Sequence, residues 1–286
     1  IATSCKLDLT LVTEESIAQC DRVGNQLQRS IPVHLNVDTG MSRLGIPVDR
    51  AIACWQAIAS SSHLDGRGLY SHFATADERD RPATQQQSDR FIRIIQEFQD
   101  RQIELPALHL SNSAATLADP RWHHQFVRVG LAMYGYPPAP HLNADGTLHP
   151  AMTVKARIIQ LKTVPAGTGV SYGHRYTTTL PTRLATVAIG YADGVPRCLS
   201  GHLRSDIGNA PVHQVGTITM DQTLWDVSQV PADDIAVGHS LAILSPEHSA
   251  QEWADLAGTI SYEILCGFSA RLPRFYLDSE ARSPVK

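Results

Sequence analysis

Several features that would point to other classes of protein are missing from this chain of 286 residues. No apolar run approaches the ~18 residues that a membrane-spanning helix needs, and the first residues do not form a signal peptide. The five cysteines are scattered, with no C-x-x-C pair, and no H-E-x-x-H is present. These absences argue against a disulfide framework or a metal site. We therefore expect reduced thiols, no bound metal and a cytoplasmic protein.

Charge of one sign is also lacking. The formal net charge is −4, which offers no basic surface for nucleic acid or for an acidic membrane. Hydrophobic residues make up 43% of the chain, enough for a sizeable core in one large or two medium domains. Lysine is scarce, and the sequence holds only Lys6, Lys155, Lys162 and Lys286.

Strand and helix patterns alternate in the first half. Apolar runs predict strands at 7–11, 33–37, 68–73, 108–111 and 126–129. Helices are predicted at 13–27, 49–60 and 84–101, and glutamines 85–87 are interpreted as an exposed helix start. Thr13 is expected to cap the first helix, whose apolar stripe is Ile17, Cys20, Val23 and Leu27. Such alternation predicts parallel strands with helical crossovers.

Polar residues follow these predicted strands, in segments 38–43, 72, 112–113 and 128–131. Functional groups in parallel sheets lie beyond the strand carboxyl ends, so we expect one pocket at the mouth of a (β/α)8 TIM-type barrel. About five of the eight strands are accounted for. We therefore expect the missing strands to precede Ile1 and the chain to be truncated.

The second half has a different character. After Tyr136 comes a proline-rich linker, and beyond it segments 152–164, 183–191, 210–227 and 235–244 are typical of strands. Only 251–257 is predicted to be helical. The boundary is placed so that 1–147 forms an incomplete (β/α) barrel domain and 148–286 a mostly β domain.

Five positions in the first half carry candidate chemistry. Arg43 can grip a carboxylate or phosphate in bidentate fashion, although a surface arginine is the simpler reading. Ser113 and Gly130 stand where helices are expected to start, and two such starts can bind one phosphate or can be ordinary capped turns. His72 and Arg128 could hydrogen-bond to each other, or His72 could be a satisfied buried histidine.

In the second half, Tyr172 lies in an aromatic-rich turn at 170–176, and compact polar clusters occupy 189–194 and 219–222. A tyrosine beside a glycine is more often a packed rim residue than a base. Its unperturbed pKa is about 10, so a cationic neighbour would be needed for it to act near neutral pH.

Taken in order, these segments resemble the alanine racemase family, which depends on pyridoxal 5'-phosphate (PLP). The resemblance runs from about residue 7 to Tyr276 and rests on HLNVDTGMSRLG at 34–45, YSHFATAD at 70–77 and HLSNSAA at 109–115. It continues with RVG at 128–130, VSYG at 170–173, GYADG at 190–194, MDQ at 220–222 and YEIL at 262–265.

The resemblance implies a role for each matching residue. Tyr172, His72 and Arg128 would be catalytic, with Tyr172 as the base for L-alanine and Arg128 facing the pyridine nitrogen. The PLP-binding set would be Asn112, Ser113, Arg128, Gly130, Leu131 and Tyr262. The substrate would meet Arg43, Met220 and Tyr191, with support from Asn36, His109 and Asp221. The family forms head-to-tail homodimers in which Tyr172 and Met220 reach the partner's site, and it supplies D-alanine for peptidoglycan.

The sequence departs from the family at two important points. The strand-end motif of the PLP-bearing lysine is absent, so the chain alone is expected to be inactive. Asn36 replaces a lysine that is often carbamylated, and members with Asn there hold a chloride ion. Two other readings stay open: a serine or broad-specificity amino-acid racemase of the same fold, and a non-catalytic relative used for binding or dimerisation.

Overall fold

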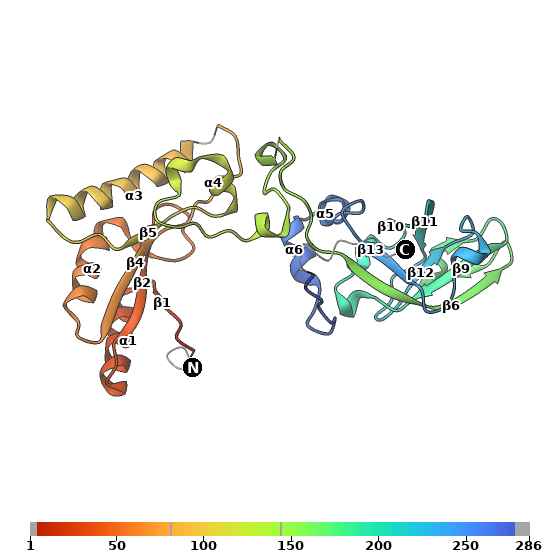
Figure 1. Ribbon diagram of the computed structural model, residues 1–286, viewed down its shortest axis with the longest axis horizontal. Helices are drawn as coiled ribbons and strands as arrows, with labels where there is room; N and C mark the ends of the chain where they lie inside the picture. Colours follow the sequence, from red (N-terminus) through yellow and green to blue (C-terminus); the bar gives the residue numbers. More distant parts are fainter. Residues whose placement is uncertain (1–4, 81, 144, 278–286) are drawn as a thin grey trace. The chain divides into compact units, whose positions relative to one another are not determined.

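A computed structural model describes residues 5–80, 82–143 and 145–277. The chain divides into two compact units, unit 1 (Ile1–Leu148) and unit 2 (His149–Lys286), and each is described by itself. In Figure 1, unit 1 runs from red to yellow-green and unit 2 from green to blue. None of the helices in the described part of the chain combines the length and apolar character needed to cross a membrane.

Unit 1 is built on a parallel sheet with the order β1-β2-β4-β5. Its strands are β1 (Leu9–Leu11), β2 (Ile31–Asp38), β4 (Leu64–Tyr70) and β5 (Ala107–His109), and the short β3 (Ile46–Pro47) pairs with the end of β2. Val33, Leu35 and Val37 of β2 have no exposed surface. The sheet is buried because parallel strands need crossover helices, which cover it.

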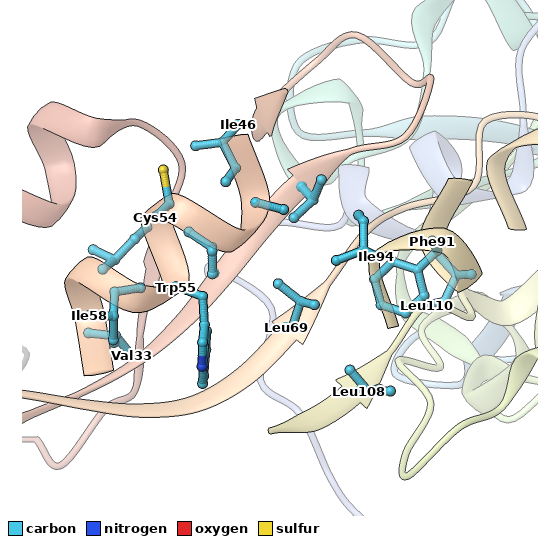
Figure 2. Packing of buried hydrophobic residues seen from close by; sticks show 14 of the residues in the cluster. Val33, Ile46, Cys54, Trp55, Ile58, Leu69, Phe91, Ile94, Leu108 and Leu110 are labelled. Atoms are coloured by element: carbon cyan, nitrogen blue, oxygen red, sulfur yellow. The ribbon is translucent and has the colours of Figure 1, made fainter. Parts of the chain in front are cut away.

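The crossover helices of unit 1 begin and end close to their predicted positions. They are α1 (Glu14–Leu27), α2 (Ala51–Ser60), α3 (Pro82–Asp100) and α4 (Ser113–Ala118), with 3-10 turns η1 (Val48–Arg50), η2 (Pro120–Trp122), η3 (Leu131–Tyr134) and η4 (Pro140–Asn143). Figure 2 shows how they pack: Trp55 and Ile58 of α2 and Phe91 and Ile94 of α3 extend toward the sheet beside Leu69.

Helix α1 confirms its predicted cap and corrects its predicted stripe. Thr13 accepts a hydrogen bond from the Ser16 amide at 3.0 Å, and the Ser16 hydroxyl accepts one from the Thr13 amide at 3.0 Å, which forms a capping box. Val23 and Leu27 are 38% and 48% exposed, so they do not belong to the buried stripe. Gly24 is buried instead, because the Cβ of His63 packs where a side chain on residue 24 would have to be.

The predicted strand at 126–129 is wrong, because these residues form no regular element. They still follow β5 and its continuation, since the Gln125 amide donates to Leu108 O at 3.1 Å and the Arg128 amide to Ser111 O at 2.9 Å. Strand β4 likewise begins and ends earlier than predicted. His72 therefore lies two residues beyond Tyr70, in the loop after the strand.

Unit 2 is mostly β, as predicted. Its antiparallel sheet has the order β10-β11-β12-β9-β6-β13, and β7 and β8 form a separate pair. The strands are β6 (Val154–Val164), β7 (Gly169–Val170), β8 (Tyr176–Thr177), β9 (Thr182–Val187), β10 (Arg204–Ile207), β11 (Ala210–Val215), β12 (Thr223–Asp226) and β13 (Ser240–Leu244).

Several elements of unit 2 differ from the prediction. The strands predicted at 183–191 and 235–244 are shorter, Thr182–Val187 and Ser240–Leu244, and β10 was not predicted. Segment 210–227 is two strands, because Gly216 adopts φ +70 and the chain turns between β11 and β12. The helices are α5 (Ala250–Ala257) and the unpredicted α6 (Ser261–Gly267), accompanied by 3-10 turns η5 (Tyr172–His174), η6 (Tyr191–Asp193), η7 (Arg197–Leu199) and η8 (Ala232–Asp234). Helix α6 is too short for its buried Ile264 and Leu265 to give a recognisable period.

Candidate active site

Arg128 is the centre of the polar network in unit 1. Its NH1 donates to His109 Nδ1 at 2.7 Å, and its NH2 donates to the Ser71 carbonyl at 2.7 Å and lies 3.3 Å from His72 Nδ1. The guanidinium carbon also lies 4.9 Å from the centre of the Tyr70 ring, a cation–π distance. Arg128 therefore links the ends of β4 and β5, and the predicted pairing of His72 with Arg128 is present.

Both histidines beside Arg128 are kept neutral. Burial, and then the positive charge of Arg128, lowers the pKa of His72 to about 4 and that of His109 to about 3. Arg43 contributes further to the shift at His72, so its charge reaches this network. Burial also lowers the pKa of Arg128, but a guanidinium keeps its proton at any usable pH. The network is a half-buried cation held by neutral acceptors.

A cavity of about 370 Å³ opens beside this network. Its walls include five of the predicted site residues: Arg43, His72, His109, Arg128 and Asn36. The structure therefore brings together residues that the sequence had only placed at separate strand ends. The remaining wall residues that matter below are Asp8, His34, Tyr70 and Ser71.

The loop that carries Arg43 is fixed from its beginning. Asp38 Oδ1 accepts from the Gly40 amide at 2.9 Å and from the Ser42 amide at 3.0 Å, which closes the turn after β2. Asn36 is buried, and Gly45, at φ +116, leaves room for its side-chain oxygen, because a Cβ on Gly45 would collide with that atom. Arg43 itself is exposed, and no residue in the described ranges forms an ion pair with it.

The structure places Ser113 and Gly130, the residues of the predicted anion site, next to each other. The Ser113 hydroxyl oxygen accepts from the Gly130 amide at 2.9 Å and from the Ala132 amide at 3.4 Å. The hydroxyl hydrogen of Ser113 is thus left to donate to an anion. A Cβ built on Gly130 meets nothing within 4 Å, so open space lies beside these groups. Leu131 buries its side chain and begins η3.

Asn112 joins the anion site to the arginine network. Its side-chain oxygen caps α4 by accepting from the Ala115 amide at 3.0 Å. Its side-chain nitrogen lies 3.5 Å from His72 Nε2 and 3.4 Å from the Phe73 carbonyl. Asn112 therefore connects the start of α4 to the loop that presents His72.

Gln87 is a site-building residue that the sequence analysis misjudged. It was expected on an exposed helix start, yet it is 2% exposed and reaches inward from α3. Its oxygen accepts from the Ala74 amide at 2.9 Å, and its nitrogen donates to the His72 carbonyl at 2.8 Å and to Thr39 Oγ1 at 3.3 Å. Thr39 Oγ1 in turn lies 2.7 Å from Ser71 Oγ. The signal available in the sequence was the helical period, because Gln87 lies on the same helix face as the apolar Phe91 and Ile94.

In unit 2, Tyr172 presents its ring to solvent from a fixed backbone. The side chain is 74% exposed, whereas the Tyr172 carbonyl accepts from Thr217 Oγ1 at 2.8 Å. Ser171, at φ 62, donates its hydroxyl to the Thr217 carbonyl at 2.6 Å. The turn is therefore anchored while the phenol is free of burial.

Tyr191 and Met220 belong to one joined pair of loops. The Tyr191 amide donates to the Thr219 carbonyl at 3.1 Å, and the Ala192 amide donates to the Met220 carbonyl at 3.0 Å. Gly190 permits this approach, because a Cβ there would collide with the Thr219 carbonyl oxygen. Tyr191 is 42% and Met220 54% exposed, so both side chains are available on the surface of unit 2.

Asp221 and Tyr262 complete the predicted set in unit 2. Arg271 lies 3.3 Å from Asp221 and 3.6 Å from Asp193, which ties the MDQ cluster to the GYADG cluster. Tyr262 stands near the start of α6 and is partly exposed. The predicted approach of these residues, and of Tyr172, to the cavity of unit 1 stays a prediction.

None of the lysines among the described residues lines the cavity. Lys6, Lys155 and Lys162 are exposed, and Lys286 lies outside the described residues.

Two family models match the chain: the alanine racemase N-terminal domain over residues 1–138 and the alanine racemase C-terminal domain over 151–276. A curated alanine racemase from a Nostoc species is 48% identical over 248 residues, 85% of this chain and 64% of the relative. One from a Synechocystis species is 43% identical over 276 residues, 95% of this chain and 74% of the relative.

A solved structure of alanine racemase from Streptomyces lavendulae, a producer of D-cycloserine, agrees in fold with a TM-score of 0.87 at 36% identity. The match covers 97% of this chain and 74% of that one. The chain thus spans about two thirds to three quarters of the length of these relatives. The resemblance inferred from the motifs is confirmed, and the chain belongs to the alanine racemase family.

Proposed function

We propose that the full-length protein carrying this chain is a cytoplasmic, PLP-dependent alanine racemase. It would interconvert L-alanine and D-alanine and supply D-alanine for peptidoglycan. The observation that carries the proposal is the cavity in which two neutral histidines hold the half-buried guanidinium of Arg128, with Arg43 also lining it. The names of the curated relatives support the same reaction.

The residues present fit two parts of PLP. The Ser113 hydroxyl and the Leu131 amide would bind the phosphate beside the open space at Gly130, joined by the Tyr262 hydroxyl. The Gly130 amide, which donates to the Ser113 hydroxyl at 2.9 Å, would share its hydrogen between that oxygen and the phosphate. Asn112, which caps α4 and lies beside His72, would connect the phosphate-binding residues to the residues around Arg128. When bound, PLP supplies an electron-withdrawing ring that makes the α-hydrogen of an amino acid acidic. No lysine is among the described residues that line the cavity.

Arg128 would face the pyridine nitrogen. Among the described residues, none accepts a hydrogen bond from its Nε, which leaves this donor for a ligand. Because a guanidinium does not release its proton, Arg128 would keep that nitrogen unprotonated. Arg128 thereby favours return of the proton to the α-carbon, which is racemisation, over transamination. His72 would connect Arg128 to Tyr172, and His109 would support it.

The substrate would be held and deprotonated by residues of both units. The Arg43 guanidinium and the Met220 backbone would hold the carboxylate. The Tyr172 phenol would exchange the α-proton of L-alanine, and the PLP-bearing lysine would act on D-alanine from the opposite face, because racemisation needs a base on each side. Tyr191 would line the entrance.

The proposal includes a head-to-tail homodimer in which Tyr172 and Met220 serve the partner's site. The exposure of both side chains on unit 2 supports this arrangement. Asp221, tied to Arg271, would support Met220. A chloride ion is proposed beside the buried Asn36, where it would orient Arg43.

The full-length protein, loaded with PLP, should racemise L-alanine and D-alanine and absorb as a PLP enzyme. Absence of both PLP absorbance and turnover would leave only the fold and favour a non-catalytic relative. The ratio of kcat/KM for L-alanine, L-serine and L-lysine tests substrate breadth, and comparable values would mean a broad-specificity racemase. The 286-residue chain alone should show no turnover, since it lacks the lysine.

A further inference from the structure

The hydrogen bond from Arg128 to His109 continues through two more side chains, which the sequence analysis did not select. His109 Nε2 lies 2.9 Å from His34 Nδ1, and His34 Nε2 lies 3.4 Å from Asp8 Oδ2. Asp8 also accepts from Arg67 NH1 at 3.2 Å. A row of two imidazoles thus connects the half-buried guanidinium of Arg128 to the exposed carboxylate of Asp8.

The chemistry of the two ends fixes the direction of every hydrogen in this row. Arg128 has only donors, so His109 Nδ1 must be the acceptor and the proton of neutral His109 must be on Nε2. His109 then donates to His34 Nδ1, which places the His34 proton on Nε2, facing Asp8. Asp8, an acceptor, completes the row. Any other tautomer of either histidine would set two donors or two acceptors against each other.

The packing holds both rings in the orientation that the row requires. His109, 4% exposed, is stacked between Tyr70 and Phe126, at 4.6 Å and 4.2 Å between ring centres. The ring of His34 occupies the space that a side chain on residue 68 would take, since a Cβ on Gly68 would collide with His34 Nδ1. The absence of a side chain at Gly68 is therefore what lets His34 reach His109.

We propose that His34 and Asp8 are positioning residues that hold His109 in its Nε2–H tautomer and thereby keep the His109 Nδ1 lone pair on Arg128. The role of this row in catalysis rests on the racemase function proposed above. Without His34, the buried Nε2–H of His109 would lose its acceptor, and the His109 tautomer that fits Arg128 would lose its support. Neither His34 nor Asp8 needs to touch the substrate.

Two-bond ¹H–¹⁵N spectra of the histidine-labelled chain test the row directly. In the wild-type chain, His109 and His34 should each show an unprotonated Nδ1 and a protonated Nε2 at neutral pH. In His34→Leu, the His109 signals should shift toward a tautomer mixture, and His34→Gln, whose amide can accept from His109 and donate to Asp8, should restore the wild-type pattern. A protonated His109 Nδ1 in the wild type, or an unchanged pattern in His34→Leu, would overturn the proposal.

Gly68→Ala is a second, independent variant because it alters no member of the row. The added methyl should displace His34 and reproduce the His34→Leu spectrum of His109. His63→Leu is the matched control, since His63 lies in the same unit and is paired with Asp21 at 3.6 Å outside the row. It should leave His109 unchanged. If the His109 signals of Gly68→Ala match those of the control, the His109 tautomer does not depend on the position of His34, and the proposal is wrong.

Kinetics of the full-length holoenzyme separate this proposal from the proposed function. His34→Leu and Asp8→Ala should lower kcat about tenfold in both directions with little change in KM, because Arg128 affects both faces equally. His34→Gln should recover most of that loss. Racemase activity with the wrong His109 tautomer would refute the row alone, and the predicted tautomers without racemase activity would refute the function alone.

Discussion

The two units place their functional groups in opposite ways. In unit 1, the groups that surround Arg128 lie at the ends of parallel strands and are held by hydrogen bonds. The buried His109 bonds to Arg128, and the buried Gln87 bonds to the His72 carbonyl. In unit 2, Tyr172, Tyr191 and Met220 expose their side chains and are fixed through their backbones. A substitution at the site in unit 1 should therefore lower both activity and stability, whereas one in unit 2 should lower activity alone.

The largest effect is expected from Arg128→Leu in the full-length enzyme. The variant removes a cation at the proposed ring site, so kcat should fall about a thousandfold or more in both directions. It also leaves buried acceptors unpaired, and urea unfolding should show a loss of about 1–3 kcal/mol. A variant that retains wild-type stability would break the coupling assigned to unit 1.

Tyr172→Phe should give the opposite combination. Exchange of the α-proton starting from L-alanine should fall about 100-fold or more, and far more than exchange starting from D-alanine. Because the ring is 74% exposed, the free energy of unfolding should change by less than about 0.5 kcal/mol. Isotope exchange starting from each enantiomer measures the two exchange rates, and thermal unfolding measures the stability. Equal losses from both enantiomers would remove Tyr172 as a one-sided base.

Gln87→Leu tests the link between helix α3 and the loop of His72. The variant removes both hydrogen bonds to segment 72–74, so stability should fall by about 1–3 kcal/mol and kcat should fall with it. Gln86→Leu is the matched control, because Gln86 is exposed on the same helix and should stay near wild type in urea unfolding and in rate. If the two variants behave alike, Gln87 does not organise the site.

The smallest effect is a pH dependence of stability that arises in unit 1. His72 and His109 have lowered folded-state pKa values of about 4 and about 3, against 6.5 for the ordinary side chain. Their contribution is complete above about pH 6.5 and is lost as the pH falls toward those values, because the unfolded chain binds protons first. Each histidine can add at most about 1.4 kcal/mol per pH unit to the slope.

Urea unfolding between pH 7 and pH 4 measures that slope. His72→Asn should reduce it, whereas substitution of the exposed Tyr172 should not. A slope that His72→Asn leaves intact would show that His72 is not held neutral by its surroundings.

The sequence by itself determined the order of strands and helices, the Thr13 cap, the β character of unit 2 and the family. These depend on local periodicity, on hydrogen bonds between near neighbours, and on motifs in a fixed order. It also selected His72, Ser113 and Arg128, because functional groups follow parallel strands.

Only the tertiary structure decided which polar residues support them. His34, Asp8 and Gly68 carry no local signal, and Gln87 carries only its helical period, since each acquires its role from a partner on another element or in another loop. The same holds for the run at 126–129, whose pairing with β5 is too irregular to form a strand. A glutamine or a histidine takes such a supporting role only when it is buried beside its partner, and that arrangement exists only in the folded chain.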